Sequence, residues 1–201
     1  MKLLKIELAA LFAFIICIFL STYNLDKSCD GIRNGILRLH VIAASDSQED
    51  QQIKLELRDE LLKKGAEIFS QSATKKDAES KIGSSISLLE ETAKAFLKSK
   101  AYPEEVSVSL GKSFFPTRKY EGFTLPAGNY DALKVIIGKG EGKNWWCIMF
   151  PALCLPAAEG KGADFDGILT ENQLSIITEE KYEVRLWLVE KWQKIKTIYN
   201  N

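Results

Sequence analysis

The pattern of apolar and polar positions changes its period along the chain. From Ile36 to Ala43, in ILRLHVIA, apolar residues alternate with Arg38 and His40, which is typical of a β-strand. From Ser47 to Ser70, apolar residues return at helical spacing, so we predict an amphipathic helix there. Its apolar face consists of Ile53, Leu57, Leu61, Ile68 and Phe69.

A second helical stripe follows a polar connection. Its apolar residues recur at spacings of three or four and are Ala78, Ile82, Ile86, Leu89, Ala93 and Phe96. They predict one helix from Lys75 to Lys98, stopped by the Tyr102-Pro103 pair. Gly83 weakens this helix by up to about 1 kcal/mol.

Beyond Pro103 the apolar residues recur at every second position. Alternation in residues 106–110 and 133–137, prolines at the margins of FFPTRKY and FTLPAGNY, and the segment NWWCIMF all indicate strands. Together these patterns predict an α+β fold. We expect a mostly antiparallel sheet of about five strands, including residues 36–43, with the two amphipathic helices on one face.

The C-terminal part begins with the loop-like AAEGKGADFDG. We therefore divide the chain into a core domain at 29–156, a flexible linker or loop at 157–178 and a C-terminal amphipathic helix at 179–201. The apolar stripe of that last helix is broad. Either the helix docks deeply, or part of its surface is left for a partner or a membrane. The stripe contains Val184, Leu188, Trp192, Ile195 and Tyr199, with Leu186, Trp187 and Val189 beside them.

The N-terminus carries an uncharged apolar run from Leu8 to Leu20 behind two lysines. Its length fits the apolar part of a signal peptide better than a full membrane span, which needs roughly 20 residues. No A-x-A site follows, so residues 1–28 are either a signal peptide or a signal anchor. The sequence LDKSC before Cys29 lacks the small residues of a lipoprotein signal, which disfavours lipidation. The lack of a polar face disfavours a buried helix of a cytosolic protein.

The composition limits the classes of molecule that the chain is expected to bind. The 201 residues suffice for one main domain, and 27 basic residues balance 27 acidic ones. No basic face is implied, so nucleic acid is disfavoured as a partner. Export makes Cys147 and Cys154 a predicted disulfide pair, although free thiols remain the alternative. The single histidine, His40, and the lack of a C-x-x-C pair disfavour zinc.

Residues that carry chemistry are sparse. A nucleophilic pair of Cys147 or Cys154 with His40 has no local support, because nothing supplies the orienting third group. The run GKGEGKN at 138–144 precedes a strand rather than a helix, so a hairpin turn is predicted instead of a phosphate loop. The sequence therefore predicts no catalytic residue, metal or cofactor, and a protein that is not an enzyme.

The acidic residues near position 46 and the adjacent tryptophans each have a structural explanation as well as a functional one. The acidic residues Asp46, Glu49 and Asp50 are explained by capping of the helix that follows. Trp145 and Trp146 are adjacent, so on a strand they point to opposite faces and only one enters the core. The other tryptophan is either an exposed anchor for a protein or a sugar, or is covered by the C-terminal helix.

Three long segments carry a family resemblance. LRLHVIAASDSQEDQQIKLELRDELL, FPTRKYEGFTLPAGNYDALKVIIGKGEGKNWWCIMFPALC and YEVRLWLVEKWQ resemble the stage II sporulation protein R family of endospore-forming Firmicutes, in the same order. Ala44 stands where members often have Asn, and Ala152 replaces one proline of FPPLC. The first departure removes a possible turn or cap hydrogen bond.

The resemblance implies a signalling protein. Such a protein is made in the forespore and exported to the space between the two membranes. There it activates a membrane-embedded aspartic protease of the mother cell, from the extracytoplasmic face, and this protease cleaves the precursor of sigma factor E. Membrane contact would involve only the N-terminal segment.

An aromatic, proline-rich surface is the predicted receptor contact of such a protein. It comprises Phe115, Pro116, Trp145, Trp146, Phe150 and Pro151. Two other functions stay open. One is an exported cell-wall or carbohydrate-binding protein that uses exposed tryptophans, and the other is an exported enzyme that depends on a cysteine.

Overall fold

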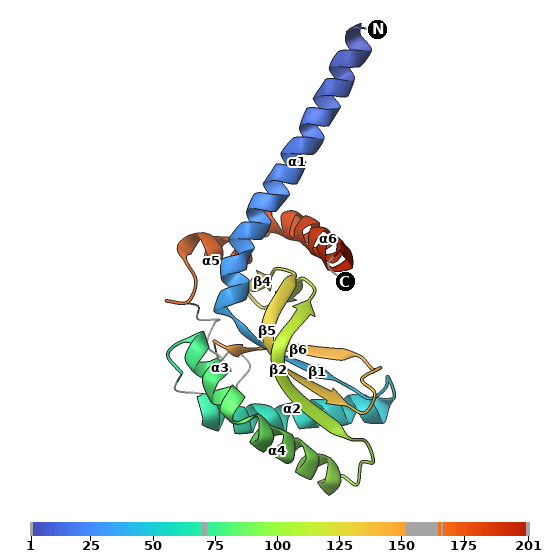
Figure 1. Ribbon diagram of the computed structural model, residues 1–201, viewed down its shortest axis with the longest axis vertical. Helices are drawn as coiled ribbons and strands as arrows, with labels where there is room; N and C mark the ends of the chain where they lie inside the picture. Colours follow the sequence, from blue (N-terminus) through green and yellow to red (C-terminus); the bar gives the residue numbers. More distant parts are fainter. Residues whose placement is uncertain (1, 70–71, 152–164, 166, 200–201) are drawn as a thin grey trace. The chain divides into compact units, whose positions relative to one another are not determined.

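The computed structural model describes residues 2–69, 72–151, 165 and 167–199. The chain forms two compact units (Figure 1). Unit 1 combines Met1–Arg33, Pro116–Gly128 and Leu169–Asn201, and unit 2 combines Asn34–Phe115 and Asn129–Ile168. Each unit therefore draws on segments that are distant in sequence.

Unit 2 is built on a mixed four-stranded sheet of order β2-β5-β1-β6. The strands are β1 (Leu37–Ile42), β2 (Val106–Phe115), β5 (Gly128–Ile137) and β6 (Asn144–Phe150). β1 pairs in parallel with β5 and antiparallel with β6. The α+β class is confirmed, whereas a mostly antiparallel sheet of about five strands is wrong. Alternation shows which residues share a face, but it does not give the direction of a neighbouring strand.

Three helices cover one face of this sheet: α2 (Gln48–Phe69), α3 (Lys75–Ser84) and α4 (Ile86–Ser99). The prediction of one helix over 75–98 is wrong, because the chain leaves helical geometry at Ser85. The Ser85 amide turns back to donate to the Ile82 carbonyl at 3.0 Å. Gly83 and the serines after it are weak helix formers, so a break there costs little.

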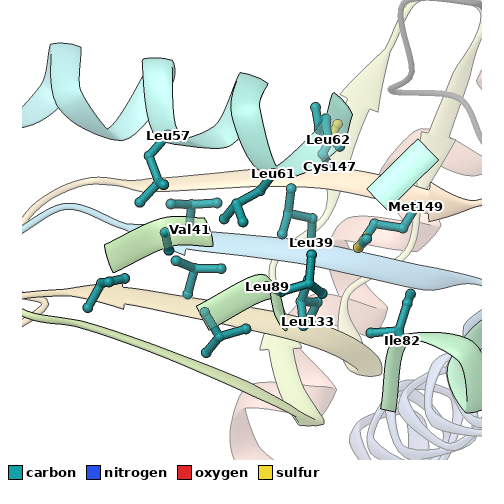
Figure 2. Close-up of a cluster of buried hydrophobic side chains, with 14 of the residues drawn as sticks. Leu39, Val41, Leu57, Leu61, Leu62, Ile82, Leu89, Leu133, Cys147 and Met149 are labelled. Atoms are coloured by element: carbon teal, nitrogen blue, oxygen red, sulfur yellow. The ribbon is translucent and has the colours of Figure 1, made fainter. Parts of the chain in front are cut away.

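The core of unit 2 lies between these helices and the sheet (Figure 2). Leu39 and Val41 of β1 meet Leu57 and Leu61 of α2 there, and all four are at most 2% exposed. Burying each such side chain contributes about 1.5–3 kcal/mol. The α3 and α4 residues buried in this core are Ala78, Ile82, Leu89, Ala93 and Leu97.

The glycine-rich connection 138–143 does not close a hairpin between β5 and β6. These strands lie on opposite sides of β1, so the connection passes over the end of β1, and the predicted hairpin is wrong. The Gly142 amide donates to the Ala43 carbonyl at 3.0 Å, and the Lys143 amide donates to Asp46 at 2.7 Å. Asp46 thus holds the connection, while the Ser47 hydroxyl caps α2. The predicted capping role of Asp46 is wrong.

We expect Gly142→Ala to lower the free energy of unfolding by about 1–3 kcal/mol, because an added Cβ would run into the Ser45 backbone carbonyl. Gly111→Ala is the matched control. An added Cβ at Gly111 meets nothing within 4 Å, so that variant should be neutral or slightly stabilising. Urea unfolding in non-ionic detergent measures both changes. Equal midpoints for the two variants would contradict this packing.

Unit 1 consists of α1, a small hairpin and the C-terminal helices. The elements are α1 (Lys2–Gly35), β3 (Arg118–Tyr120), β4 (Phe123–Leu125), α5 (Glu171–Thr178), the short 3₁₀ helix η2 (Glu180–Tyr182) and α6 (Glu183–Tyr199). α6 confirms a C-terminal helix and buries Leu186 and Val189. The predicted linker at 157–178 lies partly outside the described residues, and its described end contains α5. A capping box of Thr170 and Gln173 starts α5.

Candidate functional site: the tryptophan strand and the aromatic–arginine cluster

β6 directs its two tryptophans to opposite faces of the sheet, as the two-residue period predicts. Trp145 packs against the hydrophobic core, and the guanidinium carbon of Arg58 lies 4.3 Å from its ring centre. Trp146 stacks on His40, with ring centres 6.0 Å apart and planes at 21°. Both tryptophans are half-buried. One tryptophan therefore completes the core, and the other belongs to the opposite face.

That opposite face carries an aromatic–arginine cluster, which comprises Arg38, His40, Phe115, Tyr130 and Trp146. Arg38 is fully buried, and its guanidinium carbon lies 4.1 Å from the Phe115 ring centre and 5.1 Å from that of Tyr130. The two rings meet edge to face at 5.5 Å. Cation–π attraction is strongest where water is excluded, so this cluster holds its cation by aromatic contact.

Two hydrogen bonds orient the polar members of the cluster. Arg38 Nε donates to the Cys147 carbonyl at 3.4 Å, and His40 Nε2 lies 2.7 Å from Asn144 Oδ1. Burial lowers the pKa of His40 below its ordinary 6.5, and the charges of Lys134 and Arg38 act in the same direction. The hydrogen bond with Asn144 opposes this shift. His40 is therefore neutral at pH 7, beside a buried cation.

We expect stability to fall as the pH drops below about 6.5 toward the folded-state pKa of His40. In that window the unfolded chain binds a proton that the folded chain does not, so protonation favours unfolding. The loss of stability is measured from the urea concentration at half-unfolding, at about pH 7.5 and pH 5.5, for the wild type and for His40→Gln. Because His40 is the only histidine, the variant should lose this pH dependence. An unchanged dependence in the variant would assign it to other groups.

The structure places the six residues of the predicted receptor contact at different depths. Phe115, Phe150 and Pro151 are buried, while Pro116, Trp145 and Trp146 are half-buried. Phe115 and Trp146 both contact His40 in the cluster. Phe150 instead belongs to the core on the helix-covered side. Pro116 belongs to unit 1, and the other five residues do not form one exposed aromatic patch on unit 2. The receptor contact stays a prediction.

The predicted disulfide also stays a prediction. Cys147 is buried on β6, and Cys154 lies outside the described residues. Cys17 and Cys29 are free thiols, exposed and buried respectively. Cys147 itself is disulfide-bonded. Its pairing with Cys154 stays a prediction.

Sequence reasoning missed Arg38 and Tyr130 as members of the site. A single arginine between apolar neighbours on a strand is usually a solvent-facing residue. The missed signal was that ILRLHVIA is apolar at both ends and within, which is typical of a central strand buried on both faces.

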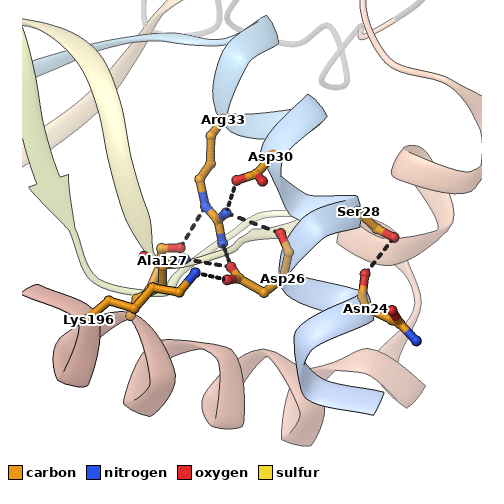
Figure 3. Close-up of polar contacts among 8 residues, drawn as sticks. Asn24, Asp26, Ser28, Asp30, Arg33, Ala127 and Lys196 are labelled. Atoms are coloured by element: carbon orange, nitrogen blue, oxygen red, sulfur yellow. Dashed lines mark hydrogen bonds and ion pairs between the residues drawn. The ribbon is translucent and has the colours of Figure 1, made fainter. Parts of the chain in front are cut away.

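Unit 1 contains a second buried charge cluster, centred on Asp26 (Figure 3). Asp26 forms ion pairs with Arg33 at 2.5 Å and with Lys196 at 2.7 Å, and it accepts a hydrogen bond from Gln193 at 2.6 Å. The side chains of Asp26 and Arg33 are only 4% and 5% exposed. This carboxylate joins the C-terminal end of α1 to α6.

Arg33 extends the same cluster toward the chain segment that follows β4. Its Nε donates to the Ala127 carbonyl at 3.0 Å, and its Nη1 pairs with the exposed Asp30 at 2.6 Å. Gly128 makes room for this side chain, because a Cβ there would run into Arg33. The site thus explains why a glycine with a φ of 146° follows Ala127.

A pocket of about 230 Å³ also lies in unit 1, between the β3/β4 hairpin and residues 176–186. Its carboxylates Glu179 and Glu183 pair with Lys181 and Lys119. A third carboxylate, that of Glu180, also lines the pocket. Within the described part of the chain, no three His, Cys, Asp or Glu side chains gather where they could hold a metal ion.

Fold and site together define an α+β domain with buried charged and aromatic clusters, following an apolar N-terminal helix. The chain belongs to the stage II sporulation protein R family, whose model matches residues 33–159. It is 35% identical over 118 residues to Stage II sporulation protein R of Bacillus subtilis (strain 168). That match covers 59% of this chain and 53% of the relative, so the chain spans about half the length of that curated protein. No solved structure matches the chain.

Proposed function

We propose that the chain is an exported sporulation signal. In this proposal it crosses from the forespore into the intermembrane space and activates the mother-cell membrane aspartic protease that processes the sigma-E precursor. Membership of the stage II sporulation protein R family supports the role in sporulation. The chain acts as a ligand of the protease in this proposal and carries no catalytic group of its own.

The observation that carries the export step is the N-terminal half of α1. This helix is long and apolar enough to cross a membrane, and the apolar window has none of its residues buried in the protein. Leu8, Phe12 and Phe19 are 59–67% exposed. A run of apolar side chains this exposed is favourable only in an apolar solvent such as lipid. The helix begins to bury side chains only at Leu25.

Continuity of α1 favours retention of this segment as an anchor. The helix runs from Lys2 to Gly35, and Leu25, Cys29 and Ile32 are buried within the folded protein. A signal peptidase site requires small residues in an accessible segment after the apolar run. Here the residues after Leu20 continue the helix, and burial within unit 1 begins at Leu25, about one to two turns later.

Activation has to follow from differential binding. A ligand shifts the equilibrium between inactive and active protease only if it binds the active state more tightly. An aspartic protease that assembles its two aspartates from two subunits would be switched by ligand-stabilised dimerisation. We propose that the protein acts in this way, from the extracytoplasmic side.

Co-expression in vegetative cells tests the proposal. The chain is produced with the receptor protease and the sigma-E precursor, and precursor cleavage is followed by immunoblot. Deletion of residues 2–20 removes the apolar run but keeps Asp26 and the buried end of α1. We expect cleavage with the full chain and none with the deletion. Cleavage by the deletion variant would overturn the export step, and peptidoglycan pull-down without cleavage would favour the wall-binding alternative.

We expect Trp146→Ala and Cys147→Ser each to reduce precursor cleavage in this assay. The first removes the half-buried ring that stacks on His40 in the aromatic–arginine cluster, and the second loosens the predicted Cys147–Cys154 loop. Leu88→Ala is the matched control, because Leu88 is 45% exposed on α4 and belongs to neither feature. Full cleavage with a stably exported Trp146→Ala protein would remove Trp146 from the receptor contact.

A further inference from the structure

α6 presents an exposed apolar stripe that the fold of unit 1 does not use. Trp187 is 54% exposed and Ile195 is 49% exposed, although Leu186 and Val189 of the same helix are buried. Lys191 lies between them at helical spacing, with its ammonium 5.2 Å from the Trp187 ring centre. We name Trp187, Leu188, Lys191 and Ile195 the α6 stripe. A large aromatic residue, aliphatic residues and a lysine on one face are typical of a helix that lies in a membrane interface.

Contacts with α1 fix where this stripe lies along the apolar helix. The Trp192 ring meets the Phe19 ring edge to face, with centres 6.4 Å apart. Gln193 and Lys196 instead reach Asp26. Phe19 and Asp26 are seven residues apart, which corresponds to about 10 Å along a helix. α6 therefore crosses α1 where the apolar run ends and the polar part begins.

Helical geometry then gives the direction in which the stripe faces. Successive residues of an α-helix are separated by about 100°, so Trp192 and Gln193 lie on different sides of α6. The Trp192 side is nearer the apolar part of α1. Seen down the axis of α6, Gln193 lies on one side of Trp192 and the α6 stripe lies on the other. With increasing angle from Trp192, the stripe residues follow in the order Leu188, Ile195, Lys191 and Trp187. The stripe therefore begins beside Trp192, on the side of α6 nearer the apolar half of α1, and continues around the exposed face of α6 to Trp187.

We propose that α6 lies in the plane of the membrane surface and inserts its stripe among the lipids. Trp187 and Ile195 would enter the boundary between headgroups and acyl chains, while Lys191 and Lys194 would contact anionic phosphates. This inference rests on the anchoring of α1 in the proposed function. It extends the predicted membrane contact beyond the N-terminal segment.

Lipid is the occupant that the contacts favour over a second copy or another protein. The stripe is continuous with α1 through the Phe19–Trp192 contact, so any bilayer that holds residues 8–20 lies directly beside it. Lys194 is half exposed although it pairs with Glu190 at 2.8 Å, and Arg185 donates to the Ser21 hydroxyl at 3.1 Å, so cations flank the apolar residues at this level. Lysines and arginines extend along an apolar surface and place their charges in the headgroup layer.

Tryptophan fluorescence tests the inference on the full chain, reconstituted in vesicles of phosphatidylcholine and phosphatidylglycerol. Lipids brominated near the headgroup end of their acyl chains quench only tryptophans at that depth. The chain has four tryptophans, so single Trp→Phe variants assign the quenching. We expect Trp187→Phe to lose a large share of the quenchable emission. Trp145→Phe, which changes a core residue of unit 2, should lose none.

Flotation of the same vesicles distinguishes failure of the α6 inference from failure of the α1 anchor. A chain that floats, with quenching that is equal in wild type and Trp187→Phe, would overturn this inference and leave the anchor intact. A chain that does not float would overturn the anchoring itself, on which this inference rests. Self-association that is lost in Trp187→Phe, without lipid quenching, would also overturn it in favour of a second copy. Precursor cleavage is measured separately, so loss of signalling with normal quenching counts against the proposed function alone.

Discussion

Replacing Asp26 by alanine should lower the free energy of unfolding of unit 1 by about 3–5 kcal/mol. Removing one partner of a buried ion pair leaves the other charge without compensation in a medium where water cannot reach it. Here the carboxylate is shared by Arg33 and Lys196, and Arg33 is only 5% exposed. The loss should appear as faster hydrogen exchange of α6 amides in non-ionic detergent. An increase of about a hundredfold or more is expected, since about 1.4 kcal/mol corresponds to a factor of ten.

Asp30→Ala is the matched control for this prediction. Asp30 lies on the same helix and pairs with the same arginine at 2.6 Å, but its side chain is 61% exposed. An exposed ion pair contributes only about 0–1 kcal/mol, so the control should leave exchange almost unchanged. Equal effects of the two variants would show that burial of Asp26 does not stabilise the junction of α1 and α6.

The second large effect is expected at Arg38 in unit 2. Arg38→Ala should cost about 3 kcal/mol, because it removes a fully buried side chain from between Phe115 and Tyr130 and leaves a cavity. Hydrogen exchange of β1 and β5 amides measures this loss in the same detergent. Exchange in α6, which belongs to unit 1, is the internal reference.

Arg38→Met separates packing from charge at this position. Methionine fills most of the arginine volume, and replacing a buried charge by a packed apolar side chain is often nearly neutral. We expect this variant to lose less than half of what Arg38→Ala loses. Equal losses would mean that the cation itself, rather than its packing between the rings, stabilises the cluster.

Periodicity located β1 and α2 of unit 2 within one or two residues. β1 spans Leu37–Ile42 where 36–43 was predicted, and α2 spans Gln48–Phe69 where 47–70 was predicted. These segments are long and strongly periodic, and their apolar faces are buried in the core. The stripe over 75–98 also predicted the buried face correctly, because Ala78, Ile82 and Leu89 are all buried. The break at Ser85 keeps both halves of the stripe on the core.

The pattern of apolar and polar residues does not determine strand direction or contacts between residues distant in sequence. The β5 alternation is the same for a parallel and an antiparallel neighbour, so the β1–β5 pairing could not be predicted. The hydrogen bond from the Lys143 amide to Asp46 joins residues 97 positions apart. A local rule assigned Asp46 to the nearest helix end, whereas tertiary contact assigns it to the β5–β6 connection.

The candidate site likewise has features that the sequence predicts and features that depend on tertiary contacts. Opposite orientations of Trp145 and Trp146 follow from the period of a strand, and the structure confirms them. The burial of Arg38 depends on Phe115 and Tyr130, which come from two other strands and can be placed only in three dimensions. The buried Asp26 similarly depends on α6, which lies about 170 residues further along the chain.

Exchange of the N-terminal segment tests the central claim most directly. Residues 1–20 are replaced by an unrelated cleavable export signal or by a short soluble leader, and precursor cleavage is measured in cells that produce the receptor protease. The account predicts cleavage with the unrelated export signal and none with the soluble leader, because activation takes place on the extracytoplasmic side. Absence of cleavage by a stably exported, folded protein, or full cleavage by the cytoplasmic form, would contradict it.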